Sequence, residues 1–198
     1  MFGLVKKLIK NPVKIVYGLQ KWGLLDWVGE EKYLRIIYRL TFKRRLNLED
    51  PKAFTEKVTW YKLHWRNGLA KKCADKLEVR EYVASKLGPK YLIDCYGCWD
   101  NFRDIDFNNL PNEFVLKPTN GSGDVVICKD KSKLVVDEAK KRLEKNIRRH
   151  FSTKTKEWAY YGLPYRIMAE RFIPGKGGTA IKDYKFFCFF GKPEFVYA

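Results

Sequence analysis

The chain has 198 residues, of which 45% are hydrophobic and 16% aromatic, so a folded core is expected. Its 40 Lys and Arg against 23 Asp and Glu give a formal net charge of +17, which indicates anionic partners such as a nucleotide, an acidic glycan or an anionic membrane surface. The basic residues are spread along the chain without an arginine-rich tail, so no nucleic-acid partner is expected. No apolar run approaches the roughly 18 residues that a membrane-spanning helix needs.

The chain divides by composition into a basic, amphipathic helical segment over residues 1–48 and a domain over residues 49–198. Between Met1 and Val28, apolar residues recur at helical spacing with lysines between them. Such a segment either packs its apolar face on the following domain or lies peripherally on an anionic membrane. Both interpretations remain open from the sequence.

Three helices are predicted next. Glu30–Phe42 has apolar residues at helical spacing. A second helix is expected to start with Asp50 as N-cap and Pro51 at its first position, and to end at Asn67-Gly68. A third is expected to start at Asp75, with Glu78 completing a capping-box-like start, and to stop at Gly88-Pro89.

Strands dominate the rest of the chain. We expect strands over residues 91–96, 114–117, 125–129 and 166–173, a charged helix over residues 135–149, and a final hairpin over residues 183–197. In that hairpin, aromatic residues stand on both sides of the alternation, which predicts that both faces are largely buried and that Lys185 is not a simple surface lysine.

The five cysteines indicate the compartment. An odd number without a secretory signal favours reduced thiols and a cytoplasmic location. Cys95-Tyr-Gly-Cys98 has the spacing of metal ligands, but neither histidine has a second ligand beside it, so ordinary buried cysteines are favoured over zinc. No metal ligand is predicted within the chain.

The strand–loop–strand around Lys117 is the candidate phosphate site. Gly121 and Gly123 let the loop fold tightly, so that backbone amides and a strand-end lysine could meet one polyphosphate. Neither the Rossmann nor the P-loop pattern is present. The alternative is an ordinary hairpin turn.

Six runs of sequence occur in a characteristic order: Ala53–Lys57, Ala74–Val83, Phe114–Pro118, Asn120–Gly123, Ile127–Ser132 and Asp183–Phe189. With these runs, the sequence resembles the TupA-like ATP-grasp family over about residues 30–198. The resemblance implies an α+β, ATP-grasp-like fold in which N-terminal helices precede an antiparallel-sheet nucleotide-binding subdomain.

The resemblance implies ATP as ligand and assigns a role to each candidate residue. Lys76 would enter from its helix to meet the phosphates, with Arg80 one turn away, and Lys117 would contact the α- and β-phosphates or the adenine edge. The loop would close over the phosphates, Glu170 would hold the adenine, Asp183 would bind the ribose, and Lys185, the catalytic candidate, would reach phosphate or an anionic acceptor. The loop residues are Asn120, Gly121, Ser122 and Gly123.

Each role has a structural alternative. Lys76 and Arg80 could form a solvated helix face, and Asp183 could simply start its strand. Glu170 could pair with Lys185 or Arg171 on neighbouring strands.

The family resemblance further implies an ATP-dependent carboxylate–amine ligase that works through an acyl phosphate in cell-surface polysaccharide or teichuronopeptide biosynthesis. Its substrates would be an acidic sugar or amino-acid carboxylate and an amine acceptor. The Mg²⁺ ligands are expected beyond Ala198, so the chain is expected to be a partial version without the C-terminal metal-binding half. The alternatives are a glycosyltransferase, with Asp104-Ile-Asp106 as metal motif, and a non-catalytic basic module that binds anions.

Overall fold

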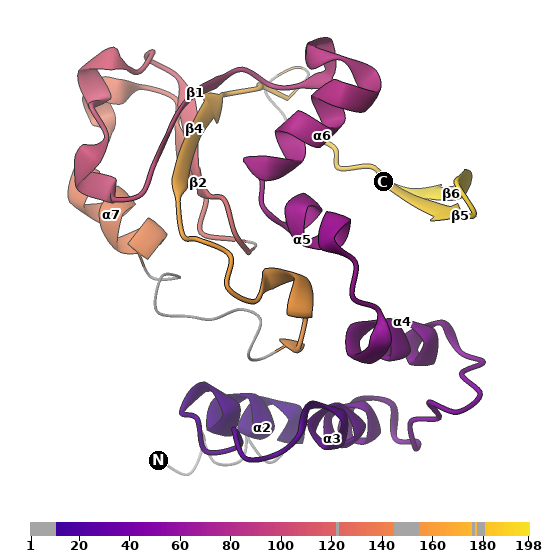
Figure 1. The fold of residues 1–198 in the computed structure, drawn as a ribbon. Helices are drawn as coiled ribbons and strands as arrows, with labels where there is room; N and C mark the ends of the chain where they lie inside the picture. Colours follow the sequence, from indigo (N-terminus) through magenta and orange to yellow (C-terminus); the bar gives the residue numbers. More distant parts are fainter. Residues whose placement is uncertain (1–10, 122, 145–154, 176, 178–180) are drawn as a thin grey trace.

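The computed structural model describes residues 11–121, 123–144, 155–175, 177 and 181–198. The fold is α+β, as predicted: helices precede a four-stranded antiparallel sheet, and a separate two-stranded hairpin ends the chain (Figure 1). None of the described helices is long and apolar enough to span a bilayer. Five three-residue 3₁₀ helices lie in the described connections, at Pro89–Tyr91, Phe102–Asp104, Phe107–Asn109, Lys131–Lys133 and Trp158–Tyr160.

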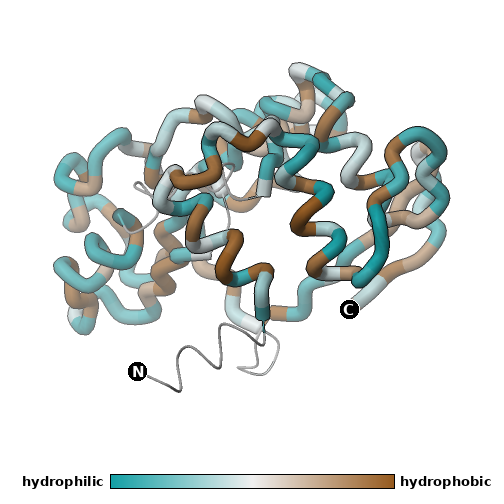
Figure 2. The backbone as a smooth tube through the Cα atoms, turned by 90° about the horizontal axis from the view of Figure 1, so that it is seen from below, coloured by the Kyte–Doolittle hydropathy of each residue, from teal (hydrophilic) through white to brown (hydrophobic). Residues whose placement is uncertain are grey.

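The first helices form an arm below the sheet. Helix α2 (Pro12–Lys21) starts with proline at its first position, and α3 (Glu30–Phe42) has the predicted bounds. Acidic residues in the first turn of α3 favour this start, and a left-handed Lys43 closes its end. Hydrophobic and hydrophilic residues alternate along these helices (Figure 2). Tyr33, Leu34 and Tyr38 are the buried apolar residues of α3, and Tyr38 forms a core cluster with Leu46 and Leu48 from the segment that follows the helix.

Helix α4 (Phe54–His64) begins later than predicted. Its N-cap is Ala53 rather than Asp50, because the Glu56 carboxylate reaches back to accept hydrogen bonds from the amides of Lys52 and Ala53. The Asn67 side chain caps α5 (Gly68–Ala74) instead of ending α4. The predicted helix thus ends at His64, and a short helix that was not predicted, α5, follows it.

Helix α6 (Glu78–Leu87) and strand β1 (Cys95–Trp99) also differ from prediction at their starts. Asp75 ends α5, and its carboxylate accepts from the amides of Leu77 and Glu78, so α6 starts three residues later than expected. The 3₁₀ turn that follows Gly88 displaces β1 toward the C-terminus.

The main sheet has the strand order β1-β4-β2-β3, with β2 (Phe114–Pro118), β3 (Val126–Cys128) and β4 (Ile167–Arg171) as predicted. Helix α7 (Val136–Glu144) covers one face (Figure 1). The rest of the predicted helix, residues 145–149, lies outside the described residues. The core between sheet and helix includes Phe114, Leu116, Ile167, Ala169, Ala139 and Leu143.

The predicted C-terminal hairpin is present as β5 (Lys185–Phe189) and β6 (Lys192–Tyr197). The expectation that both of its faces are buried is wrong. Every residue of both strands is exposed, and Phe187 stacks on Phe195 across the pair. The aromatic residues thus favour two paired strands, but no described residue packs over either face of the hairpin.

Candidate nucleotide site

One face of the main sheet gathers charged side chains from β2, β4 and α6. Because side chains alternate along a strand, Phe114, Leu116 and Pro118 point into the core and Lys117 points to the opposite face. On β4, Glu170 is only 7% exposed. Lys117 stands opposite Met168 and so is a diagonal neighbour of Glu170, with which its ammonium forms an ion pair.

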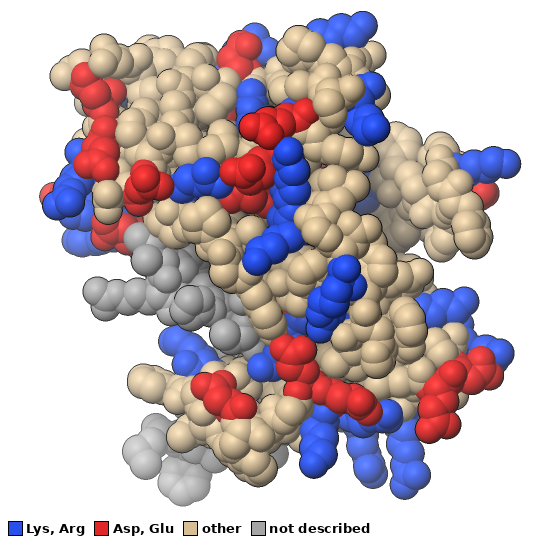
Figure 3. All heavy atoms as spheres, in the orientation of Figure 1, with Lys and Arg blue, Asp and Glu red and all other residues tan. Residues whose placement is uncertain are grey.

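Arg80 of α6 joins this pair from the side. Its guanidinium lies 3.5 Å from the second Glu170 oxygen and also donates to the Ile93 carbonyl. Figure 3 shows acidic and basic side chains interleaved between the sheet and α6, rather than a uniformly basic surface. Glu170 thus holds two cations, and the predicted pairing with Lys185 or Arg171 is not the one formed.

Lys76 lies against the glycine loop. It sits in the turn between α5 and α6, not within a helix as expected. Its amide donates to the Thr119 carbonyl at 2.8 Å, and its ammonium donates to the carbonyls of Gly121 at 2.6 Å and Thr119 at 3.4 Å. Burial lowers the pKa of Lys76, and the nearby Lys117 charge lowers it further.

The loop itself needs glycine. Gly121 and Gly123 have φ of 75° and 90°, a region that residues with a Cβ rarely adopt. The Asn120 amide approaches the Leu163 carbonyl at 3.5 Å, and Ser122 lies outside the described residues. Lys76 and the loop are therefore fixed to each other through backbone carbonyls.

A buried ion pair between Asp75 and Arg166 holds the Lys76 turn next to the glycine loop. Asp75 is fully buried; its carboxylate accepts from Arg166 at 3.2 Å, and Arg166 also pairs with Glu78 at 2.9 Å. The Arg166 carbonyl accepts from the Thr119 amide, so the same residue joins the start of β4 to the loop. Arg166 was not among the predicted site residues, because nothing in its local sequence marks its pairing with Asp75.

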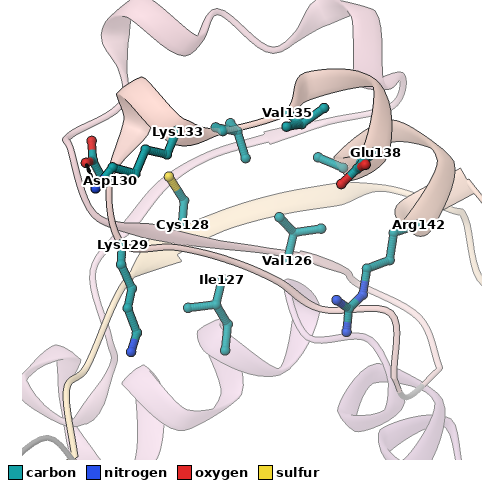
Figure 4. A pocket seen from close by; sticks show the side chains of 11 residues that line it. Val126, Ile127, Cys128, Lys129, Asp130, Lys133, Val135, Glu138 and Arg142 are labelled. Atoms are coloured by element: carbon teal, nitrogen blue, oxygen red, sulfur yellow. Dashed lines mark ion pairs between the residues drawn. The ribbon is translucent and has the colours of Figure 1, made fainter.

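Thr119 and Ile127 were also missed. The Thr119 hydroxyl is buried without a partner among the described residues. Ile127, 57% exposed, stands opposite Val115 in the β2–β3 pair, and Figure 4 shows it turned away from α7 together with Lys129. The alternation of the two strands could have placed Ile127 on the Lys117 face.

The structure brings Lys76, Lys117, Gly121 and Glu170 together, but Asp183 and Lys185 lie elsewhere. Both are exposed, pair with each other and belong to the C-terminal hairpin (Figure 1). Their roles in a nucleotide site stay predictions.

Other candidates have structural roles. The Asp106 carboxylate caps the turn at Asn108, and Asp104 accepts from Asn101, as expected of a solvated, capping pair rather than a metal motif. All five cysteines are free. Among the described residues, no three His, Cys, Asp or Glu side chains gather as a metal site.

A groove of about 520 Å³ runs along the edge strand β3 beside α7 (Figure 4). Lys129, Lys133, Glu138 and Arg142 line it with apolar neighbours, and Lys76, Lys117 and Glu170 do not. The groove therefore does not include the charged residues of the candidate nucleotide site.

Comparison with known proteins identifies the family. The chain matches no curated protein and no solved structure. The sequence model of the family described as TupA-like ATPgrasp matches residues 56–198, which is more than half of the chain and includes every candidate site residue. The chain therefore belongs to the TupA-like ATP-grasp family.

Proposed function

We propose that the chain binds ATP on the sheet face that carries Lys117 and Glu170, beside Lys76 in the turn between α5 and α6. The observation that supports this most is the convergence of three cations, Lys76, Lys117 and Arg80, around one buried carboxylate and a glycine loop. Charge-assisted hydrogen bonds to phosphate are stronger than those to neutral acceptors, so a polyphosphate would compete well for these donors.

The residues present fit a nucleotide. Phosphate oxygens would replace the loop carbonyls as acceptors for Lys76, and their negative charge would offset the desolvation that lowers its pKa. Val115 and Ile127 offer an apolar surface beside Lys117 for a base. Glu170 would keep Lys117 and Arg80 aligned on this face.

The carboxylates of the described site are not free to bind Mg²⁺, because cationic side chains already pair with them. The carboxylate on this face, Glu170, is already paired with two cations, and Asp75 is paired with Arg166. The described part of the chain thus assigns no ligand to Mg²⁺.

We further propose that this binding serves an ATP-dependent carboxylate–amine ligase of cell-surface polysaccharide biosynthesis at the inner face of the membrane. ATP supplies the phosphoryl group that activates a carboxylate for attack by an amine. Lys76 and Lys117 would neutralise the phosphate charge, as preorganised donors do in phosphoryl transfer. In this proposal Asp183 would accept from the ribose hydroxyls and Lys185 would meet the carboxylate of an acidic sugar or amino acid, which requires the exposed C-terminal hairpin to approach the sheet face when the ligands bind.

Competition between nucleotides tests the proposal. We expect ATP to displace a fluorescent ATP analogue from the protein, while a UDP-sugar at the same concentration does not. Displacement by the UDP-sugar but not by ATP would contradict the proposal and favour a glycosyltransferase. If neither nucleotide binds, the proposal fails as well, and a non-nucleotide anion becomes the candidate ligand.

Alkaline pH gives a second test, directed at Lys76. Phosphate favours the charged ammonium, so ATP affinity should fall as the pH rises through the lowered pKa of Lys76, starting below the ordinary value of 10.5. Lys76→Arg keeps its charge and should show a flatter profile of ATP dissociation constant against pH, with circular dichroism confirming that both proteins stay folded. Parallel profiles would remove Lys76 from the site.

A further inference from the structure

The arm of helices carries an exposed apolar surface far from the charged cluster in sequence. Ile15 and Leu19 of α2 and its C-cap residue Trp22 follow each other at helical spacing and are 39%, 37% and 77% exposed. The turn after α2 adds Leu24 and Trp27, which are 59% and 84% exposed. We call these five residues the tryptophan face.

The turn that carries Trp27 is well ordered by hydrogen bonds. The Trp27 indole donates to the Leu24 carbonyl at 3.0 Å, and the Leu24 amide donates back to Leu19 at 3.1 Å. The buried Gln20 amide donates to Asp26 at 2.7 Å across the turn. Both tryptophans therefore stand on a folded element and would lose little conformational entropy on binding a surface.

Exposed basic residues are frequent in the part of the chain that carries this face. Lys14 and Lys21 lie beside Ile15 and Trp22, and the Lys21 ammonium is 5.8 Å from the Trp22 ring. Residues 11–45 hold eight Lys and Arg, all exposed, against three Asp and Glu. Figure 3 shows several of the basic side chains projecting from the lower edge of the molecule, below α3. The partner of this surface is therefore anionic as well as apolar.

We propose that the tryptophan face docks the protein on an anionic lipid bilayer, with α2 lying in the plane of the membrane surface. Tryptophan favours the membrane–water interface, where its ring is half apolar and its N–H is wet. Lysines on an amphipathic helix add attraction to anionic headgroups. A nucleic acid or polysaccharide would satisfy the lysines but would leave Ile15, Leu19 and Leu24 without an apolar partner.

Vesicle co-sedimentation of the full chain tests the proposal. We expect binding to vesicles of phosphatidylcholine mixed with phosphatidylglycerol, and little binding to pure phosphatidylcholine. Trp22→Ala with Trp27→Ala should weaken binding about tenfold or more, because both interfacial anchors are lost. The matched control, Trp60→Ala with Trp65→Ala, removes two exposed tryptophans, one in α4 and one at its C-cap, and should bind as the wild type does.

A second pair of variants isolates charge. Lys14→Glu with Lys21→Glu should lose about tenfold or more, since each basic residue near the surface contributes about 1 kcal/mol. The same reversal at Lys86 and Lys90, which are also exposed, should have a much smaller effect. The lysine variants leave the apolar residues intact, so they test vesicle binding even if the tryptophan variant folds poorly.

The proposal fails if the protein sediments with neither kind of vesicle, or if the test and control variants lose vesicle binding equally. It also fails if Trp22→Ala abolishes a concentration-dependent dimer but leaves vesicle binding unchanged, because the tryptophan face would then be a protein–protein interface. ATP binding measured on the same proteins separates this inference from the proposed function, because neither variant pair touches Lys76, Lys117 or Glu170. Loss of vesicle binding with ATP binding unchanged is the expected pattern.

Discussion

Lys117→Ala is expected to weaken ATP binding about thirtyfold to a hundredfold, the equivalent of losing about 2–3 kcal/mol from a charged hydrogen bond. Two effects add in the same direction. The phosphates lose a positioned donor, and Glu170 keeps only Arg80 as partner, so a buried carboxylate with less compensation faces the incoming anion. Isothermal calorimetry of wild type and variant measures the change.

A double variant separates these two effects. Glu170→Gln in the Lys117→Ala background removes the uncompensated charge of Glu170 and should recover part of the lost ATP affinity. Glu170→Gln alone should not improve ATP binding, because Lys117 and Arg80 then lose the carboxylate that aligns them. Lys140→Ala, an exposed lysine on α7, is the control for net charge and should bind ATP as the wild type does. Wild-type affinity in Lys117→Ala would exclude this face as the phosphate site.

The sequence predicted the central hairpin well because local chemistry decides it. In β2 and β3, β-branched and apolar residues alternate around a loop whose two glycines have positive φ, and those positions tolerate little else. The bounds of α3 followed from its periodicity in the same way. The approach of Lys117 to Glu170 could be expected once the strands were known, since they lie on adjacent strands of one sheet.

Helix starts and long-range pairs were harder to predict. Asp50 and Pro51 look like a helix start, but Glu56 caps α4 from inside and moves its start to Phe54. The final hairpin shows the converse limit. Its aromatic residues predict a pair of strands, yet whether a face is buried depends on what packs against it, and no described residue covers it.

Asp75→Ala is expected to cost about 3 kcal/mol of the free energy of unfolding at neutral pH. The carboxylate is fully buried, accepts from Arg166 across 91 positions of sequence, and caps two amides at the start of α6. Removing one partner of a buried ion pair typically costs about 3–5 kcal/mol, and the loss of a cap alone about 1 kcal/mol. Glu78 still pairs with Arg166 and limits the loss. Urea unfolding measures it.

Asp130 offers a matched control, because it makes the same two kinds of interaction at the surface. Its carboxylate caps the amide of Ser132 and pairs with Lys133, whose side chain is largely exposed. Asp130→Ala should therefore cost about 1 kcal/mol or less, since exposed ion pairs contribute little. Equal losses in Asp75→Ala and Asp130→Ala would mean that the buried pair does not stabilise the fold. Asp75 directly precedes Lys76, so the buried ion pair also fixes the position of this phosphate-binding lysine. Asp75→Ala should therefore weaken ATP binding as well, whereas Asp130→Ala should not.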